Sequence, residues 1–169
     1  TGTWLVAYNG TSSGGKESVL TVRVDNPLNN PTFFTQTVQV GDIDDTANTI
    51  DPTVPSPFLP PVPQKSTTAL LDFSDRRMQH AVWRNNSLYA VTQILPGSGP
   101  DTNQVTVHWF RIDTTNPAQL ALADQGNIGG EDVGSNVFTS YGSIAVDPAN
   151  NMAIGFSATG PGMYAGSYY

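Results

Sequence analysis

The sequence predicts an all-β fold made of antiparallel four-stranded repeats. The first observation is a degenerate repeat, in which Arg23-Val24-Asp25 and Arg111-Ile112-Asp113 each end a stretch of alternating apolar and polar residues. In both copies a Gly follows 16 residues after the Asp, at Gly41 and Gly129. The second observation is that 16 Gly and 13 Pro are enough to separate many short strands by turns. A recurring multi-strand unit is typical of a β-propeller, of which this chain would hold roughly two to three incomplete blades.

The first partial blade is expected at residues 1–41. Its strands are predicted at residues 3–9, 17–25 and 33–40. The segments between these strands are rich in Gly, Ser, Asn and Pro, which favour turns. In the middle strand Leu20, Val22 and Val24 alternate with polar residues, which is the period of two expected of a strand. One face of this strand is therefore predicted to be buried.

Residues 42–77 interrupt the strand pattern and are predicted to form an acidic, proline-rich connection. The segment opens with the acidic residues Asp42, Asp44, Asp45 and Asp51. Prolines follow at positions 52, 55, 57, 60, 61 and 63. Because proline lacks a backbone N–H and has a fixed φ, this stretch is incompatible with a helix or a central strand. We expect an extended excursion that runs over the surface or between the repeats.

A complete blade is predicted at residues 78–130 and a second partial blade at residues 131–169. The predicted strands are 78–83, 88–94, 105–112 and 121–128 in the complete blade, and 143–146, 152–158 and 163–169 in the last one. The first and last blades would each lack one strand, and β-proteins avoid unpaired sheet edges. We therefore expect the chain to be a piece of a longer polypeptide. Either the remainder of that polypeptide or a companion chain is expected to complete the sheets.

Composition and charge favour a secreted or cell-surface protein. Only 12% of the residues are charged, against about 25% in typical proteins, and neutral polar residues supply the solubility instead. The net charge is -7 and Arg76-Arg77 is the only basic cluster, so nucleic acid is not an expected partner. The sequence has no Cys, and no apolar run approaches the roughly 20 residues of a membrane span.

The segment from Leu71-Asp72 through Asp75-Arg76-Arg77 to the hairpin Trp83-Arg84-Asn85-Asn86 resembles a pattern in large secreted bacterial repeat proteins of poorly defined function. In that family the order is Leu-Asp, then Asp-x-Arg, then an aromatic-Arg-Asn-Gly-x-Leu-Trp hairpin. Asn86 stands where Gly is more usual, and a hairpin can accommodate this change.

The resemblance extends over about residues 63–169. Residues 107–113 are similar to the next strand of the family pattern, and residues 147–157 are similar to the opening hairpin of the following blade. The resemblance implies a β-propeller-like repeat region in an extracellular setting. It implies no catalytic residue.

Asp42, Asp44 and Asp45 are candidate ligands for a calcium ion. Ca²⁺ takes about six to eight oxygen atoms from closely spaced carboxylates and carbonyls, and Asn48 and Asp51 follow shortly after. The Gly and the closing Glu of an EF-hand loop are missing, so we favour a solvated acidic loop over a calcium site. The sequence indicates no other cofactor.

A compact charged group precedes the complete blade and permits two interpretations. Its members are Asp72, Asp75, Arg76, Arg77 and Arg84. Paired arginines could recognise a carboxylate ligand. We favour a structural role, in which Asp72 or Asp75 caps a turn and pairs with an Arg between blades, because the same residue types recur in the resembling family.

The sequence contains no recognisable catalytic constellation. Hydrolysis of a glycosidic bond requires two carboxylates about 5–10 Å apart, and the two Glu residues, Glu17 and Glu131, lie beside Gly-rich turns. His80 and His108 lie on different predicted strands without a third ligand, so ordinary structural roles are expected. We expect a non-catalytic protein, with part of a secreted propeller hydrolase, completed by segments outside this chain, as the alternative. The carboxylates to inspect for that alternative are Asp72, Asp75 and Asp132.

The aromatic residues permit two interpretations. Several of them, Trp4 and Trp83 included, alternate with residues expected to face the core, and outward-facing rings near Asn and Gln could stack on sugar rings. We favour the second interpretation, in which these rings fill the wedge between neighbouring blades. A structural, adhesive or carbohydrate-contact role is therefore expected.

Overall fold

The structure is a computed structural model that describes residues 2–8, 17–44, 58–73 and 76–169. The described residues form ten β-strands and no helix, so the predicted all-β class is confirmed. The strands are β1 (Gly2–Ala7), β2 (Glu17–Asp25), β3 (Thr32–Gly41), β4 (His80–Arg84), β5 (Ser87–Ile94), β6 (Thr106–Asp113), β7 (Ala121–Ile128), β8 (Phe138–Val146), β9 (Met152–Gly160) and β10 (Met163–Tyr168).

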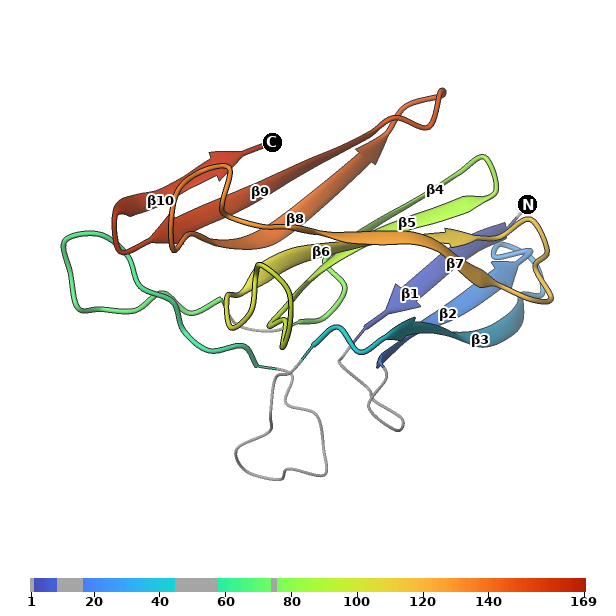
Figure 1. The fold of residues 1–169 in the computed structure, drawn as a ribbon. Helices are drawn as coiled ribbons and strands as arrows, with labels where there is room; N and C mark the ends of the chain where they lie inside the picture. Colours follow the sequence, from blue (N-terminus) through green and yellow to red (C-terminus); the bar gives the residue numbers. More distant parts are fainter. Residues whose placement is uncertain (1, 9–16, 45–57, 74–75) are drawn as a thin grey trace.

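The strands form three antiparallel sheets, in which each strand pairs with its neighbours in sequence (Figure 1). The first sheet has the order β1-β2-β3, the middle sheet β4-β5-β6-β7 and the third sheet β8-β9-β10. Among the described residues, only the middle sheet has the four strands predicted for a complete repeat. The first and third sheets each have three.

The predicted strand positions agree with the structure within a few residues, except at β8. This strand begins at Phe138, five residues before the predicted start at 143. The pairing of β8 with β9 shifts register between Ser140 and Ser143, and Tyr141 has a φ of 53°. A bulge interrupts the alternation of side chains that marks a strand in the sequence, which explains why the first part of β8 was missed.

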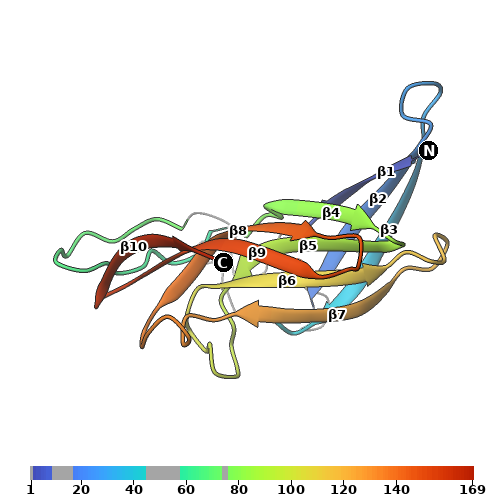
Figure 2. The ribbon, with the colours of Figure 1, turned by 90° about the horizontal axis from the view of Figure 1, so that it is seen from above.

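The middle sheet lies between the other two sheets, so both of its faces are buried (Figures 1 and 2). Its strand β5 is buried at every position from Leu88 to Ile94. Because successive side chains of a strand point to opposite faces, Leu88 packs toward the first sheet and Tyr89 toward the third. A run of apolar residues in β5 is the sequence pattern that such two-sided burial requires.

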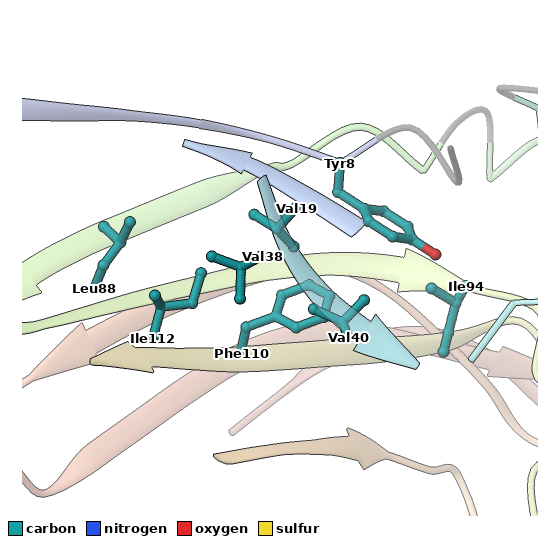
Figure 3. Packing of buried hydrophobic residues seen from close by; sticks show 8 residues of the cluster. All are labelled: Tyr8, Val19, Val38, Val40, Leu88, Ile94, Phe110 and Ile112. Atoms are coloured by element: carbon teal, nitrogen blue, oxygen red, sulfur yellow. The ribbon is translucent and has the colours of Figure 1, made fainter. Parts of the chain in front are cut away.

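The interface between the first and middle sheets is shown in Figure 3. Its buried residues are Tyr8, Val19, Val38 and Val40 from the first sheet and its end, and Leu88, Ile94, Phe110 and Ile112 from the middle sheet. The rings of Tyr8 and Phe110 lie 5.8 Å apart at their centroids. Contacts of this kind fix the two sheets face to face.

The interface between the middle and third sheets is formed mainly by β8, which contacts β4, β5 and β6. Ile144 and Ile154 of the third sheet pack against Val91 and Val107 of the middle sheet. Gly142 permits this close approach, because a Cβ at that position would lie 3.0 Å from Val107 Cγ1.

The described part of the proline-rich connection is anchored in the fold. Leu59, Val62 and Phe73 are buried against Val105, which precedes β6. Val62 also forms an isolated antiparallel bridge with Leu71. The described part of the segment therefore doubles back at this bridge and contributes buried residues to the core.

Candidate functional site

A buried ion pair joins the acidic opening of the connection to its arginine cluster. Arg76 Nη1 donates a hydrogen bond to Asp44 Oδ2 at 2.5 Å, and both side chains are buried. The hydroxyl of Tyr8 donates to the same oxygen at 3.4 Å, and the backbone N–H of Leu95 donates to Asp44 Oδ1 at 3.3 Å. Asp44 thus links the end of β3 to the connection and to the end of β5.

This pairing differs from the partners considered in the sequence. We expected an Arg to pair with Asp72 or Asp75, whereas Arg76 pairs with Asp44, 32 residues before it. Asp72 is exposed, and Asp75 lies outside the described residues. Arg77 is exposed and Arg84 is half-buried at the end of β4. Arg76 therefore has a structural partner in Asp44, and the pairing expected for Asp72 or Asp75 stays a prediction.

Two of the three predicted calcium ligands, Asp42 and Asp44, lie in the described part of the chain. Asp42 is exposed, Asp44 is occupied by Arg76, and Asp45 lies outside the described residues. In the described ranges, no three His, Cys, Asp or Glu side chains lie close enough to hold a metal ion. The calcium site stays a prediction that depends on the undescribed part of the connection.

Two further titratable groups lie near this ion pair. Glu17 Oε2 accepts a hydrogen bond from the backbone N–H of Ile43 at 2.8 Å, and burial raises the pKa of Glu17 above 4.5. The pKa of Tyr8 is raised first by burial and then by the negative charges of Asp44 and Glu17. These groups form a charged cluster within the interface between the first and middle sheets.

His108 lies in a buried polar network on the same side of the middle sheet. Its Nδ1 lies 2.7 Å from Asn127 Oδ1, and Asn127 Nδ2 donates to Asp101 Oδ2 at 2.9 Å. Burial lowers the pKa of His108 below 6.5. His80 is exposed, and its Nδ1 accepts a hydrogen bond from the backbone of Ile144 at 3.1 Å. Both histidines therefore have the ordinary structural partners that the sequence favoured.

One groove on the described surface contains a carboxylate named above for hydrolysis. Asp132 lines a groove of about 580 Å³ between the end of β7 and strands β9 and β10. Phe156 and Tyr168 form one wall, with their rings stacked at 5.9 Å. Asp132 is the only carboxylate among the lining residues, so the described groove lacks the pair that glycoside hydrolysis requires.

Another groove contains two of the three Trp residues. It has a volume of about 360 Å³ and lies between β1 of the first sheet and β4 of the middle sheet. Its lining residues are Gly2, Trp4, Arg23, Asp25, Trp83, Asn86, Thr114, Thr115 and Pro117. They come from the start of β1, the end of β2, the β4–β5 hairpin and the β6–β7 connection, which meet at one end of the stack (Figure 1).

The walls of this tryptophan groove are fixed by hydrogen bonds. Trp83 Nε1 donates to Thr114 Oγ1 at 2.9 Å, and the backbone N–H of Thr114 donates to Asn86 O at 2.8 Å. On the other wall Arg23 and Asp25 form an ion pair with an N–O distance of 2.9 Å. The groove therefore presents rigid aromatic surface beside paired polar groups.

Comparisons of the chain with protein-family models, with curated proteins and with solved structures find no match. Within the described ranges, no helix is long and apolar enough to cross a membrane.

Proposed function

We propose that this chain is a non-catalytic segment of a secreted or cell-surface β-propeller, with a structural, adhesive or carbohydrate-contact role. The observation that carries this proposal is the stack of three antiparallel sheets, which follow one another in chain order with both faces of the middle sheet buried. Sequential antiparallel sheets packed face to face are the building principle of propeller blades. The sequence resemblance over about residues 63–169 supports the same interpretation.

The exposed apolar residues on the outer face of the first sheet favour a partner that covers this face. Leu5, Leu20 and Phe33 lie on that face, and their side chains are 57%, 42% and 63% exposed. An exposed apolar sheet face of this kind is typical of a surface that is covered in the functional assembly. In the proposal, the remainder of the same polypeptide or a companion chain covers this face and completes the sheets.

The test of this proposal is the intact mass of the native material under denaturing conditions, together with its mass in solution. We expect either a polypeptide well above 18.0 kDa or a second chain in constant ratio. A native protein of 18.0 kDa that is monodisperse and melts cooperatively would contradict the partner, because its exposed sheet face would then be stable in water.

The alternative function, part of a propeller hydrolase, has one observation in its favour. Asp132 lies in the groove beside Phe156 and Tyr168, where a second carboxylate from another segment could complete a catalytic pair. Assay of the complete native protein against glycoside substrates, with and without Asp132→Asn, tests this alternative. Loss of hydrolysis in the variant would favour it over the non-catalytic role.

A further inference from the structure

We propose that the tryptophan groove binds one ring of a neutral sugar by stacking it against Trp83. This inference rests on the carbohydrate-contact role proposed above, and it names the site and the class of ligand. The groove volume of about 360 Å³ falls within the range of roughly 300–1,000 Å³ that is usual for small-molecule sites.

The stacking surface is accessible and held in place. Trp83 is 50% exposed, so part of its indole is available to a ligand. Its hydrogen bond to the buried Thr114 fixes the rotation of the ring. A ring that is already immobilised loses little conformational entropy when a ligand stacks on it, which favours binding.

Polar groups beside the indole match the hydroxyl groups of a sugar. Arg23 can donate hydrogen bonds and Asp25 can accept them, and the ion pair between the two holds both side chains next to each other on the groove wall. Adjacent hydroxyls of a sugar ring both donate and accept hydrogen bonds, so they can bind to such a pair together. The exposed amide of Asn86 adds a further donor and acceptor at the rim.

The electrostatics of the groove favour a neutral ligand. The charge of Arg23 is offset by Asp25, and its guanidinium also lies 4.6 Å from the centroid of the Phe34 ring. The chain as a whole has a net charge of -7, which repels anionic glycans. A neutral hexose unit therefore fits the groove better than a uronic acid or a sulfated sugar.

The groove at Asp132 is less suited to a sugar. Two of its three aromatic rings, those of Phe156 and Tyr168, stack on each other. The third, that of Tyr169, is exposed and has no paired polar side chains beside it among the lining residues. Apart from Asp132, its wall residues are mainly apolar, among them Met152 and Ile154. The combination of an exposed indole and paired polar side chains is found in the tryptophan groove.

The experiment is a titration of the full chain with cellohexaose, mannohexaose and maltohexaose, followed by tryptophan fluorescence and calorimetry, with heparin as the anionic probe. We expect at least one neutral hexasaccharide to bind and heparin to bind more weakly. Trp83→Ala is expected to weaken binding by about tenfold or more, because truncation of a central aromatic anchor removes most of the stacking surface. Thr114→Val, which removes the partner of the indole N–H, is expected to cause a smaller loss.

The matched control is Tyr164→Ala, which removes another exposed aromatic ring, on β10, and is expected to leave sugar affinity unchanged. If Trp83→Ala binds as tightly as the unmodified chain, the groove is the wrong site, although the carbohydrate-contact role stands. If no neutral hexasaccharide binds the folded, unmodified chain, both the groove and the carbohydrate-contact role are overturned. The mass measurement on the native material still tests the propeller architecture in that case. Tighter binding of heparin would overturn the neutral class of ligand.

Discussion

The two interfaces of the middle sheet are built from different chemistry. The interface with the first sheet contains the ion pair of Asp44 and Arg76, and it also contains Tyr8, Glu17 and His108. The interface with the third sheet is centred on apolar residues such as Val91 and Ile144. One sheet thus packs one of its faces against a cluster of buried titratable groups and the other face mainly against apolar residues.

This difference indicates which interactions attach each outer sheet to the middle sheet. The polar contacts with the third sheet include those of two amides and one imidazole: Gln93 Oε1 accepts from the backbone of Tyr141 at 3.0 Å, Gln79 Oε1 accepts from Gly142 at 2.7 Å, and His80 Nδ1 accepts from Ile144 at 3.1 Å. The two amide contacts do not change between pH 4 and 8, whereas the His80 contact requires an unprotonated Nδ1. Because the interface with the first sheet contains more buried titratable groups, we expect the attachment of the first sheet to depend more strongly on pH than that of the third sheet.

The largest expected effect is that of breaking the buried ion pair. Arg76→Met leaves the carboxylate of Asp44 buried without its cation, which is expected to cost about 3–5 kcal/mol in the free energy of unfolding. Urea denaturation followed by circular dichroism measures this loss. The double variant Arg76→Met with Asp44→Leu is the matched control and is expected to recover most of the stability, because replacement of both charges by apolar groups is often neutral. A loss below about 1 kcal/mol in the single variant would contradict the buried position of the pair.

A cavity in the other interface is expected to have the next largest effect. Ile144→Ala removes a buried side chain at the centre of the contact with the third sheet, at a cost of about 3 kcal/mol. The same urea experiment at pH 7.5 and pH 5 should give similar losses, because Ile144→Ala keeps the backbone N–H that donates to His80 and removes no titratable group. A loss that changes strongly between these two pH values would show that the two interfaces are coupled.

A smaller effect is expected from the titration of His108. Since burial holds its pKa below 6.5 in the folded state, the unfolded chain binds a proton first as the pH falls through 6.5. Stability should therefore decrease below pH 6.5, by at most about 1.4 kcal/mol per pH unit, until the folded state is also protonated. His108→Gln should lose this slope, measured by urea midpoints from pH 7.5 to 5. His80→Gln, which changes an exposed histidine, should retain it.

The smallest expected effect is that of Glu17. Burial raises the pKa of Glu17 above 4.5, so the unfolded chain loses the Glu17 proton at a lower pH than the folded protein does. As the pH rises from 4.5 past the pKa of the folded state, the folded protein therefore loses stability relative to the unfolded chain, and this loss persists at neutral pH. Glu17→Gln keeps an oxygen to accept from Ile43 and removes the charge, so it should stabilise the protein at pH 7 by about 1 kcal/mol or less and have no effect near pH 4. Thermal melts at both pH values test this, and destabilisation at pH 7 would show that the charge is needed.

The positions of the strands were largely predictable because they depend on local patterns. The alternation in β2 and the turn-forming residues between strands gave bounds close to the observed ones, and the apolar run Leu88–Val91 in β5 matches its two-sided burial, although Thr92 and Gln93 of the same strand are buried as well. The pattern failed at the beginning of β8, where the bulge at Tyr141 breaks the period of two.

The candidate sites were predictable only as residue types. Trp4 and Trp83 lie in different predicted blades, and their shared groove depends on how the first and middle sheets stack. The repeated Arg residues have different partners: Arg23 pairs with Asp25, whereas Arg111 lies 3.7 Å from Asp124. The pairing of β6 with β7 shifts register between Arg111 and Ile112, and this irregularity distinguishes the second copy of the repeat from the first.

The sequence by itself determined that this protein is an antiparallel β-protein, because strand periodicity and turn residues act over only a few neighbouring positions. Only the tertiary structure decided that Asp44 is the partner of Arg76 and that two tryptophans share one groove. These contacts join residues that are distant in the chain, and they depend on the stacking of whole sheets, which no local pattern encodes.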